Sequence, residues 1–162
     1  MNIAVCPGTF DPCTLAHIDI IKRAAKIFDR VYVGVLTNTN KNPVFTCEER
    51  VFMLETCLKH EGVTNCEVRS FRGMLVDFAR EVSASVTVRG LRSVSDFDSE
   101  LLMSDLNGKL SPELQTVLFM APPHLRAISS SAVREIGKCG GDLKGFVHES
   151  VLNMITERLL KL

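Results

Sequence analysis

Short apolar runs alternate along this chain with stretches whose apolar residues recur every three or four positions. A short apolar run bounded by turn residues is typical of a strand buried on both faces, and the longer periodicity is typical of a helix. Strands are expected at 3–6, 31–36, 67–71, 86–89 and 117–120. The alternation predicts an α/β fold: a single doubly wound, five-stranded parallel sheet with right-handed crossovers and helices on both faces.

The helices are expected from their start signals and apolar stripes. Thr14 is a candidate N-cap for a helix from Leu15, and Thr46 with Glu49 forms a T-x-x-E capping box ahead of Val51, Leu54 and Leu58. Further helical stretches are expected at 75–82, at 96–106 and after Ser131. The last stretch, 147–162, carries one apolar stripe and predicts a C-terminal covering helix; the stripe consists of Val147, Val151, Ile155 and Leu159.

The charge balance narrows the choice of partners. The chain has 162 residues, with 19 basic and 19 acidic side chains and a formal net charge of zero. This length predicts a single domain, 1–162, and the neutral balance excludes a broadly basic nucleic-acid-binding protein. Any anion site must therefore be local, made by a few well-placed cations.

The six cysteines predict neither a zinc site nor a disulfide framework, because no C-x-x-C pair occurs and none has metal-ligand spacing to a histidine. We interpret them as small buried hydrophobic residues of a reducing compartment. No apolar stretch approaches the length of a membrane span, and no basic segment precedes the first apolar run. The expected location is the cytoplasm, with no membrane partner.

Ligands of open α/β sheets bind beyond the carboxyl ends of the strands, at the point where the strand order reverses. The first expected strand leads into Pro7-Gly8-Thr9-Phe10-Asp11-Pro12, and then Thr14 and His17 lie in the first helical turn. Free N–H groups and the positive dipole end attract phosphate there. Taken alone, His17 fits a surface histidine as well as a phosphate donor.

Other strand ends favour the phosphate interpretation. Lys41 follows the second strand, Arg89 and Arg92 follow the fourth, and three serines open a helix after the fifth. A P-loop is disfavoured because Gly137-Lys138 is followed by Cys139. A standard dinucleotide-binding domain is disfavoured because no G-x-G-x-x-G follows the first strand.

Several motifs of the chain, taken together, match those of a known family. The chain contains four motifs of interest: Pro7 to Pro12, the T-x-x-H of Thr14 to His17, Arg89-Gly90-Leu91-Arg92 with Asp96-Phe97, and Ile128-Ser129-Ser130-Ser131. Together they resemble the motifs of the bacterial phosphopantetheine adenylyltransferases of the nucleotidylyltransferase superfamily. The resemblance runs nearly end to end, and the R-G-L-R block with D-F distinguishes this member of the superfamily. It also implies the superfamily's Rossmann-like fold.

The resemblance implies reversible transfer of the adenylyl group of ATP to 4′-phosphopantetheine, giving dephospho-coenzyme A and pyrophosphate. The acceptor phosphate attacks the α-phosphorus in line, so positioning and charge stabilisation carry the chemistry. His17 matches the histidine that donates to the α-phosphate. The expected acceptor-side residues are Lys41 and Arg89, which hold its phosphate, Thr9, which bridges acceptor and nucleotide, and Leu75, which contacts the pantetheine arm.

The resemblance also implies the nucleotide site and the partners. Mg²⁺ is expected to arrive with ATP, no dedicated metal ligands are expected, and the family forms a homohexamer that coenzyme A is expected to inhibit at the same site. The expected ATP-binding residues are Thr9, Phe10, His17, Gly90, Leu91, Arg92, Glu100, Leu125, Arg126, Ala127, Ile128, Ser129, Ser130 and Ser131.

Some residues depart from the family pattern. Ala16 stands where glycine is usual, Ser99 and Leu125 replace frequent aromatics, and Asn42 stands where a second cation is sometimes seen. Ala16 would narrow the approach of the nucleotide to the backbone, and it is the best argument for an alternative, a non-catalytic nucleotide-binding module. A second alternative is a transferase with another acceptor, such as nicotinate mononucleotide. Arg134 either faces the triphosphate or lies in solvent.

Overall fold

The computed structural model describes residues 1–37 and 42–162. Within these residues, five strands form one all-parallel sheet in the order β3-β2-β1-β4-β5. This confirms the predicted α/β class, and each predicted strand lies inside an observed one. The strands are β1 (Ile3–Gly8), β2 (Arg30–Leu36), β3 (Cys66–Phe71), β4 (Val86–Leu91) and β5 (Gln115–Met120).

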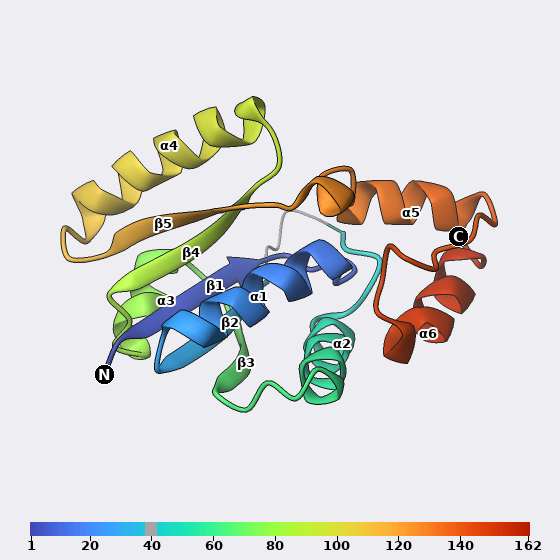
Figure 1. Cartoon of the computed structure of the whole chain (residues 1–162), viewed down its shortest axis with the longest axis horizontal. Helices are drawn as coiled ribbons and strands as arrows, with labels where there is room; N and C mark the ends of the chain where they lie inside the picture. The colour runs from blue at the N-terminus through green and yellow to red at the C-terminus, as the bar shows by residue number, and fades with distance from the viewer. Residues whose placement is uncertain (38–41) are drawn as a thin grey trace.

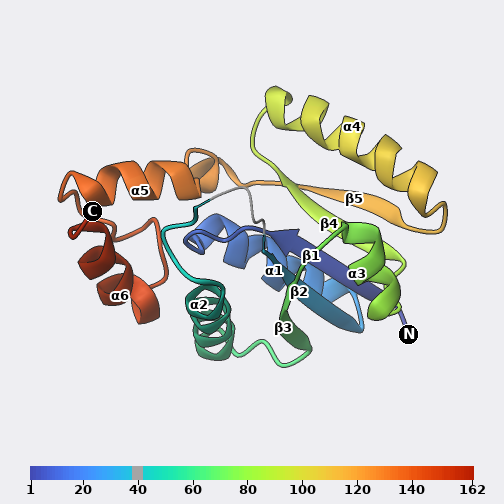
Figure 2. The same ribbon diagram turned by 180° about the vertical axis from the view of Figure 1, so that it is seen from behind.

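Helices cover both faces of the sheet. In Figure 1, α1 lies in front of the strands beside α2, whereas α3 lies behind them and comes forward in the reverse view of Figure 2. The fourth helix contacts α3, β4 and β5. The bounds are α1 (Leu15–Ile27), α2 (Cys47–His60), α3 (Leu75–Glu81), α4 (Val94–Leu110), the 3-10 turn η1 (Pro123–Leu125), α5 (Ser130–Lys138) and α6 (Glu149–Leu159).

The C-terminal helix α6 is shorter than the predicted stretch and covers other helices. It packs on α2 and α5, as Figure 1 shows. The predicted stripe is confirmed, since Val147, Val151, Ile155 and Leu159 are all buried, although Val147 precedes the helix. No helix in the described part of the chain has both the length and the apolar character to cross a membrane.

The first strand continues past its expected end. Pro7 and Gly8 belong to β1 and pair with Gly34 and Val35 of β2, where the sequence predicts a turn. On its other side β1 pairs with β4 only at Ala4 and Val5. A proline lacks the N–H that a central strand donates, so Pro7 is tolerated where only one neighbour is paired. Strands β1 and β4 therefore separate toward their carboxyl ends, at the point where the strand order reverses.

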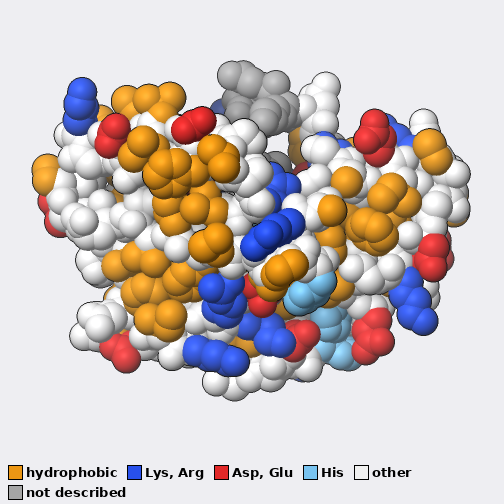
Figure 3. Space-filling model, turned by 45° about the horizontal axis from the view of Figure 1, so that its top comes forward, with side chains coloured by type: hydrophobic (Ala, Val, Ile, Leu, Met, Phe, Trp, Pro, Cys, Tyr) orange, Lys and Arg blue, Asp and Glu red, His pale blue; other side chains and the backbone are white. Residues whose placement is uncertain are grey.

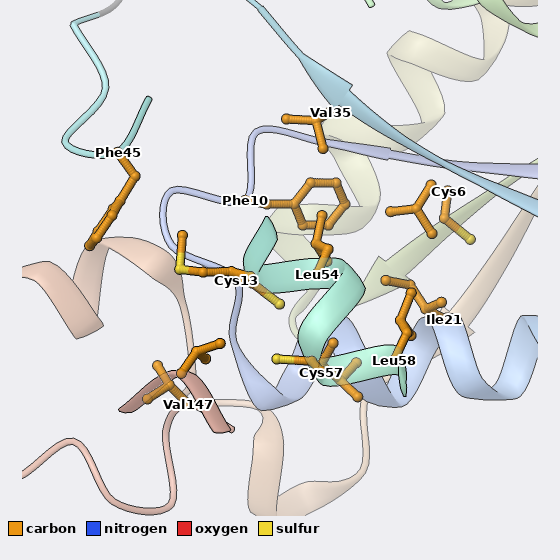
Figure 4. Packing of buried hydrophobic residues seen from close by; sticks show 14 of the residues in the cluster. Cys6, Phe10, Cys13, Ile21, Val35, Phe45, Leu54, Cys57, Leu58 and Val147 are labelled. Carbon is orange, nitrogen blue, oxygen red and sulfur yellow. The ribbon is translucent and has the colours of Figure 1, made fainter. Parts of the chain in front are cut away.

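The main core joins α2 to the first strand and the loop after it. In Figure 4, Phe10 and Cys13 lie beside Leu54 and Cys57 of α2. Cys6, Cys13 and Cys57 are buried as predicted, and burial raises the pKa of the Cys6 thiol well above its ordinary value. All six cysteines are free thiols, but Cys47 and Cys66 are only half-buried and Cys139 is exposed, so these three do not fit the prediction of buried residues.

Candidate active site

A cavity of about 330 Å³ opens where β1 and β4 separate. Its wall combines the end of β1 and the following turn, the first turns of α1 and α5, the end of β4 and the start of α4. Most of the predicted site residues meet here. They are Thr9, Phe10, His17, Arg89, Gly90, Arg92, Glu100, Ile128, Ser129, Ser130 and Ser131.

The other predicted site residues lie elsewhere or are not described. Leu75 begins α3 and packs against the smaller core cluster around Phe78. Leu125 is buried against Ala16 and Ile128, beside the cavity wall. Leu91, Arg126 and Ala127 are outside the lining. Lys41 lies outside the described residues.

His17 is held by the N-cap of its own helix. The Thr14 hydroxyl accepts a hydrogen bond from the His17 backbone N–H at 3.4 Å, and the Thr14 backbone N–H donates to His17 Nδ1 at 3.1 Å. A backbone N–H can only donate, so Nδ1 carries no proton in this geometry. The neutral ring therefore carries its proton on Nε2, and the imidazole, which lines the cavity, is a hydrogen-bond donor.

The surroundings keep this imidazole neutral. Burial, followed by the positive charges of Arg92 and Arg89, lowers the pKa of His17 from 6.5 to about 4. Protonation would also place a second donor on Nδ1, facing the Thr14 N–H. His17 is thus a neutral donor near pH 7, suited to stabilise developing negative charge.

Phe10 supports the imidazole from the side. The two ring centroids lie 5.0 Å apart with an interplanar angle of 78°, an edge contact. Phe10 has a φ of 53°, which a bulky residue adopts only when its surroundings hold it there. Gly8 makes room for the ring, because a Cβ built there would lie 2.8 Å from Phe10 Cζ.

Both arginines of the cavity are paired with carboxylates of α4. Arg89 donates from Nε and Nη2 to Glu100 and from Nη1 to the Pro7 carbonyl at 2.7 Å, across the gap between β4 and β1. Arg92 donates from Nε to Asp96 Oδ2 at 3.0 Å. Burial raises the pKa of Asp96, but hydrogen bonds from Arg92 outweigh it and the net shift is downward.

The start of α5 closes the opposite wall. Ser129 caps this helix by accepting from the Ala132 N–H at 3.1 Å, and Ser130 Oγ donates to the Pro12 carbonyl at 2.7 Å. Arg134 donates to the Asp11 carbonyl, and to Ser131 Oγ at 3.3 Å, so its guanidinium lies against the turn after β1. Two helix N-termini, those of α1 and α5, thus face one cavity, an arrangement that favours a polyphosphate.

Close packing places α1 against the end of β4. A Cβ built on Gly90 would lie 2.1 Å from Ile20 Cδ1, so a larger residue there would have to displace the end of the Ile20 side chain. Gly90 thus favours close packing of α1 on the end of β4, beside Arg89.

Sequence reasoning missed three residues that organise the site. Asp96 and Asp11 stand in the sequence motifs without a role of their own, and Arg50 lies in none of these motifs. A signal for Arg50 exists: it precedes Leu54 by four residues and Cys57 by seven, which places it on the apolar face of α2. The observed face includes Arg50 and Met53, while the predicted Val51 is only half-buried.

Comparisons with known proteins identify the family. A cytidylyltransferase-like family model matches residues 5–136. The chain is 48% identical over 158 residues to a phosphopantetheine adenylyltransferase of Alkaliphilus metalliredigens, covering 98% of this chain and 99% of the relative. A second such enzyme, of Rubrobacter xylanophilus, is 47% identical over 157 residues, covering 97% and 94%. The chain belongs to the phosphopantetheine adenylyltransferase family.

Solved structures of more distant proteins have the same fold. The nicotinic acid mononucleotide adenylyltransferase of Plasmodium falciparum superposes with a TM-score of 0.72 at 16% identity, covering 99% of this chain and 95% of that one. A bifunctional NMN adenylyltransferase/ADP ribose pyrophosphatase of Francisella tularensis gives a TM-score of 0.74 at 16% identity, covering 99% and 51%. These likenesses confirm the Rossmann-like nucleotidylyltransferase fold.

Proposed function

We propose that this protein reversibly transfers the adenylyl group of ATP to 4′-phosphopantetheine, giving dephospho-coenzyme A and pyrophosphate in coenzyme A synthesis. The observation that carries the proposal is the protonation state of His17, a neutral imidazole with its proton on Nε2 in a cavity that two arginines line. Full-length relatives named phosphopantetheine adenylyltransferase support the choice of reaction.

The arrangement suits direct displacement at the α-phosphorus. His17 donates to the α-phosphate as charge develops, while the N-termini of α1 and α5 receive the nucleotide's phosphates. Pyrophosphate leaves toward Ser129, Ser130 and Ser131. Because the acceptor's own phosphate oxygen is the nucleophile, the enzyme needs no covalent intermediate.

Among the residues that the structure describes, Arg89 is the cation that we assign to the acceptor phosphate. A guanidinium has five N–H donors, and Glu100 and Pro7 engage three of those on Arg89. The remaining donors suit a phosphate monoester in the cavity. The proposed acceptor site is completed by Lys41, Thr9 and Leu75. The proposed ATP site includes Phe10, Leu91, Arg92 and the stretch 125–131.

Glu100 lines the cavity, as an ATP-binding residue would, and it also contacts Arg89. Its carboxylate is committed to Arg89 and is mostly buried. We propose that Glu100 orients Arg89 in addition to its expected contact with ATP.

The alternatives have less support. A nicotinate mononucleotide acceptor is suggested only by structural neighbours of 16–17% identity, which share the fold and no more. A non-catalytic binding module would have no use for an imidazole whose pKa is lowered to about 4 beside two arginines.

We propose that magnesium comes with ATP. The two cavity carboxylates, Asp96 and Glu100, are paired with arginines, and the described residues include no group of three His, Cys, Asp or Glu side chains that suits a metal. The residues that the structure describes thus offer no cage, and the phosphates would hold the ion and have their charge reduced by it.

We also propose a homo-oligomer, a hexamer by family resemblance. Apolar side chains gather over α4, on the left of Figure 3. A contiguous exposed apolar face of this kind marks an interaction surface. Its exposed residues are Val94, Phe97, Leu101, Leu102, Met103, Leu106 and Leu110. We also propose inhibition by coenzyme A, which the same resemblance implies, and a cytoplasmic location, which is expected from the sequence.

The test is pyrophosphate release from ATP and Mg²⁺ with each acceptor in turn. We expect release with 4′-phosphopantetheine and none with nicotinate mononucleotide; the reverse result would refute the proposal. His17→Ala should reduce turnover about 100-fold or more while ATP still binds, because the lost donor acts mainly in the transition state.

A further inference from the structure

Arg50 of α2 is a buried cation that binds backbone. Its exposed fraction is 2%, and its acceptors among the described residues are main-chain carbonyl oxygens. Nε donates to Phe45 at 3.2 Å and to Thr46 at 3.3 Å. Nη1 donates to Thr9 at 2.7 Å and to Leu36 at 3.0 Å. One side chain therefore joins the start of α2, the end of β2 and the turn after β1.

Asp11 holds the same region from the other side. This carboxylate is 6% exposed and accepts from the backbone N–H of Val44 at 3.0 Å and of Phe45 at 2.9 Å. Phe45 is thus bound by Asp11 through its N–H and by Arg50 through its carbonyl. Hydrogen bonds to Phe45 and Thr46 hold the Arg50 guanidinium where its Nη1 reaches the Thr9 carbonyl.

The Thr9 carbonyl belongs to the peptide plane that precedes Phe10. Fixing that carbonyl fixes one side of the rotation about the Phe10 N–Cα bond, whose φ of 53° a bulky residue rarely adopts. The Phe10 ring in turn touches the edge of the His17 ring, with centroids 5.0 Å apart.

We propose that Arg50 is a positioning residue for adenylyl transfer: it sets the Thr9–Phe10 peptide, and through Phe10 it holds the His17 imidazole in place. The contacts form a continuous series from Arg50 to Thr9, Phe10 and His17. The effect on turnover rests on the proposed role of His17, but the effect on the position of the ring does not.

The first variant is Arg50→Lys, which keeps the charge but loses the planar fork that reaches both Phe45 and Thr9. We expect kcat to fall about tenfold or more, because a small displacement of a catalytic group is costly, while the dissociation constant of ATP changes less than about threefold. The melting temperature is measured alongside.

A double-mutant cycle separates positioning from a merely structural role. If Arg50 acts through His17, then Arg50→Lys changes kcat less than about twofold in a His17→Ala background. A full tenfold loss in that background would overturn the inference. Failure of His17→Ala itself to lower turnover would instead count against the proposed role of His17.

A second readout needs no activity. In the ligand-free protein, Arg50→Lys should shift the NMR signals of the His17 ring, because the ring current of Phe10 moves relative to it. Unchanged His17 signals would overturn the inference even if turnover fell.

Arg158→Met is the matched control. Arg158 also donates to a carbonyl of this segment, that of Val44 at 3.2 Å, but its contacts do not include Thr9. We expect nearly full turnover and unshifted His17 signals. Equal effects of the two variants, full turnover in Arg50→Lys, or its failure to fold would show that Arg50 only supports the fold.

Discussion

Glu100 accepts hydrogen bonds from Arg89 Nε at 2.9 Å and from Arg89 Nη2 at 2.8 Å. The carboxylate comes from the second turn of α4 and the guanidinium from β4, so this pair ties the helix to the edge of the cavity. The contact occupies the Nε side of the guanidinium, Pro7 accepts from Nη1, and the two remaining N–H donors are left for a ligand.

Glu100→Gln should therefore disturb the orientation of Arg89. An amide has one acceptor oxygen, and its NH₂ group repels the guanidinium donors. We expect turnover to fall about tenfold to 100-fold, with a higher KM for the acceptor, in steady-state assays. The control is Asp98→Asn, at an exposed position of the same helix outside the cavity lining. The turnover of this variant should stay near that of the unmodified protein.

The lowered pKa of His17 predicts a titration that is displaced toward acid. The ring should remain neutral from pH 8 to about 5 and become protonated near pH 4, whereas an unfolded chain takes up this proton near 6.5. Because the pKa of His17 is lower in the folded protein than in the unfolded chain, protonation favours unfolding. The contribution of the neutral ring to the free energy of unfolding is therefore complete above pH 6.5 and is lost as the pH falls toward 4. Carbon and nitrogen NMR shifts of His17 measure this, and a midpoint near 6.5 would contradict it.

Ala16→Gly tests the departure at the start of α1. The Ala16 methyl is buried against Leu125 and Ile128 while the residue also lines the cavity. We expect turnover to stay the same or rise, with a stability loss of about 1 kcal/mol from the added backbone freedom. Thermal unfolding and ATP titration provide the readouts. A large loss of activity would mean that the nucleotide does not lie against this turn.

Gly90→Ala should destabilise the protein by about 1–3 kcal/mol, because the new methyl would overlap Ile20. Gly108→Ala is the matched change, since a Cβ there meets nothing within 4 Å on helix α4. That second variant should be stabilised by about 0.5–1 kcal/mol. Denaturant unfolding compares the two, and equal effects would contradict the packing argument.

The apolar face of α4 predicts an assembly that charge should break. Leu102→Glu combined with Leu106→Glu adds two carboxylates to exposed positions of this face. We expect the oligomer to dissociate with helix content preserved, because neither side chain packs in the core. Light scattering gives the mass and circular dichroism the helix content. An unchanged oligomer would place the interface elsewhere.

The strands were predictable because their apolar runs are continuous, and the helices because their caps are explicit. Both predicted caps are confirmed, with Thr14 and Thr46 accepting from the third helical residue. The end of β1 was not predictable, because Pro7 and Gly8 are ordinary turn residues. Their extended form depends on pairing with Gly34 and Val35, a neighbour distant in sequence.

The sequence by itself determined the order of elements, the neutral charge that demands a local anion site, and the residue types that gather at the strand ends. Those properties depend on local periodicity and composition. Only the tertiary structure decided that His17 is a neutral donor, that Glu100 and Asp96 orient the arginines, and that a buried Arg50 holds Thr9. Protonation and orientation depend on burial and on partners far along the chain, and only the folded protein brings these partners within hydrogen-bonding distance.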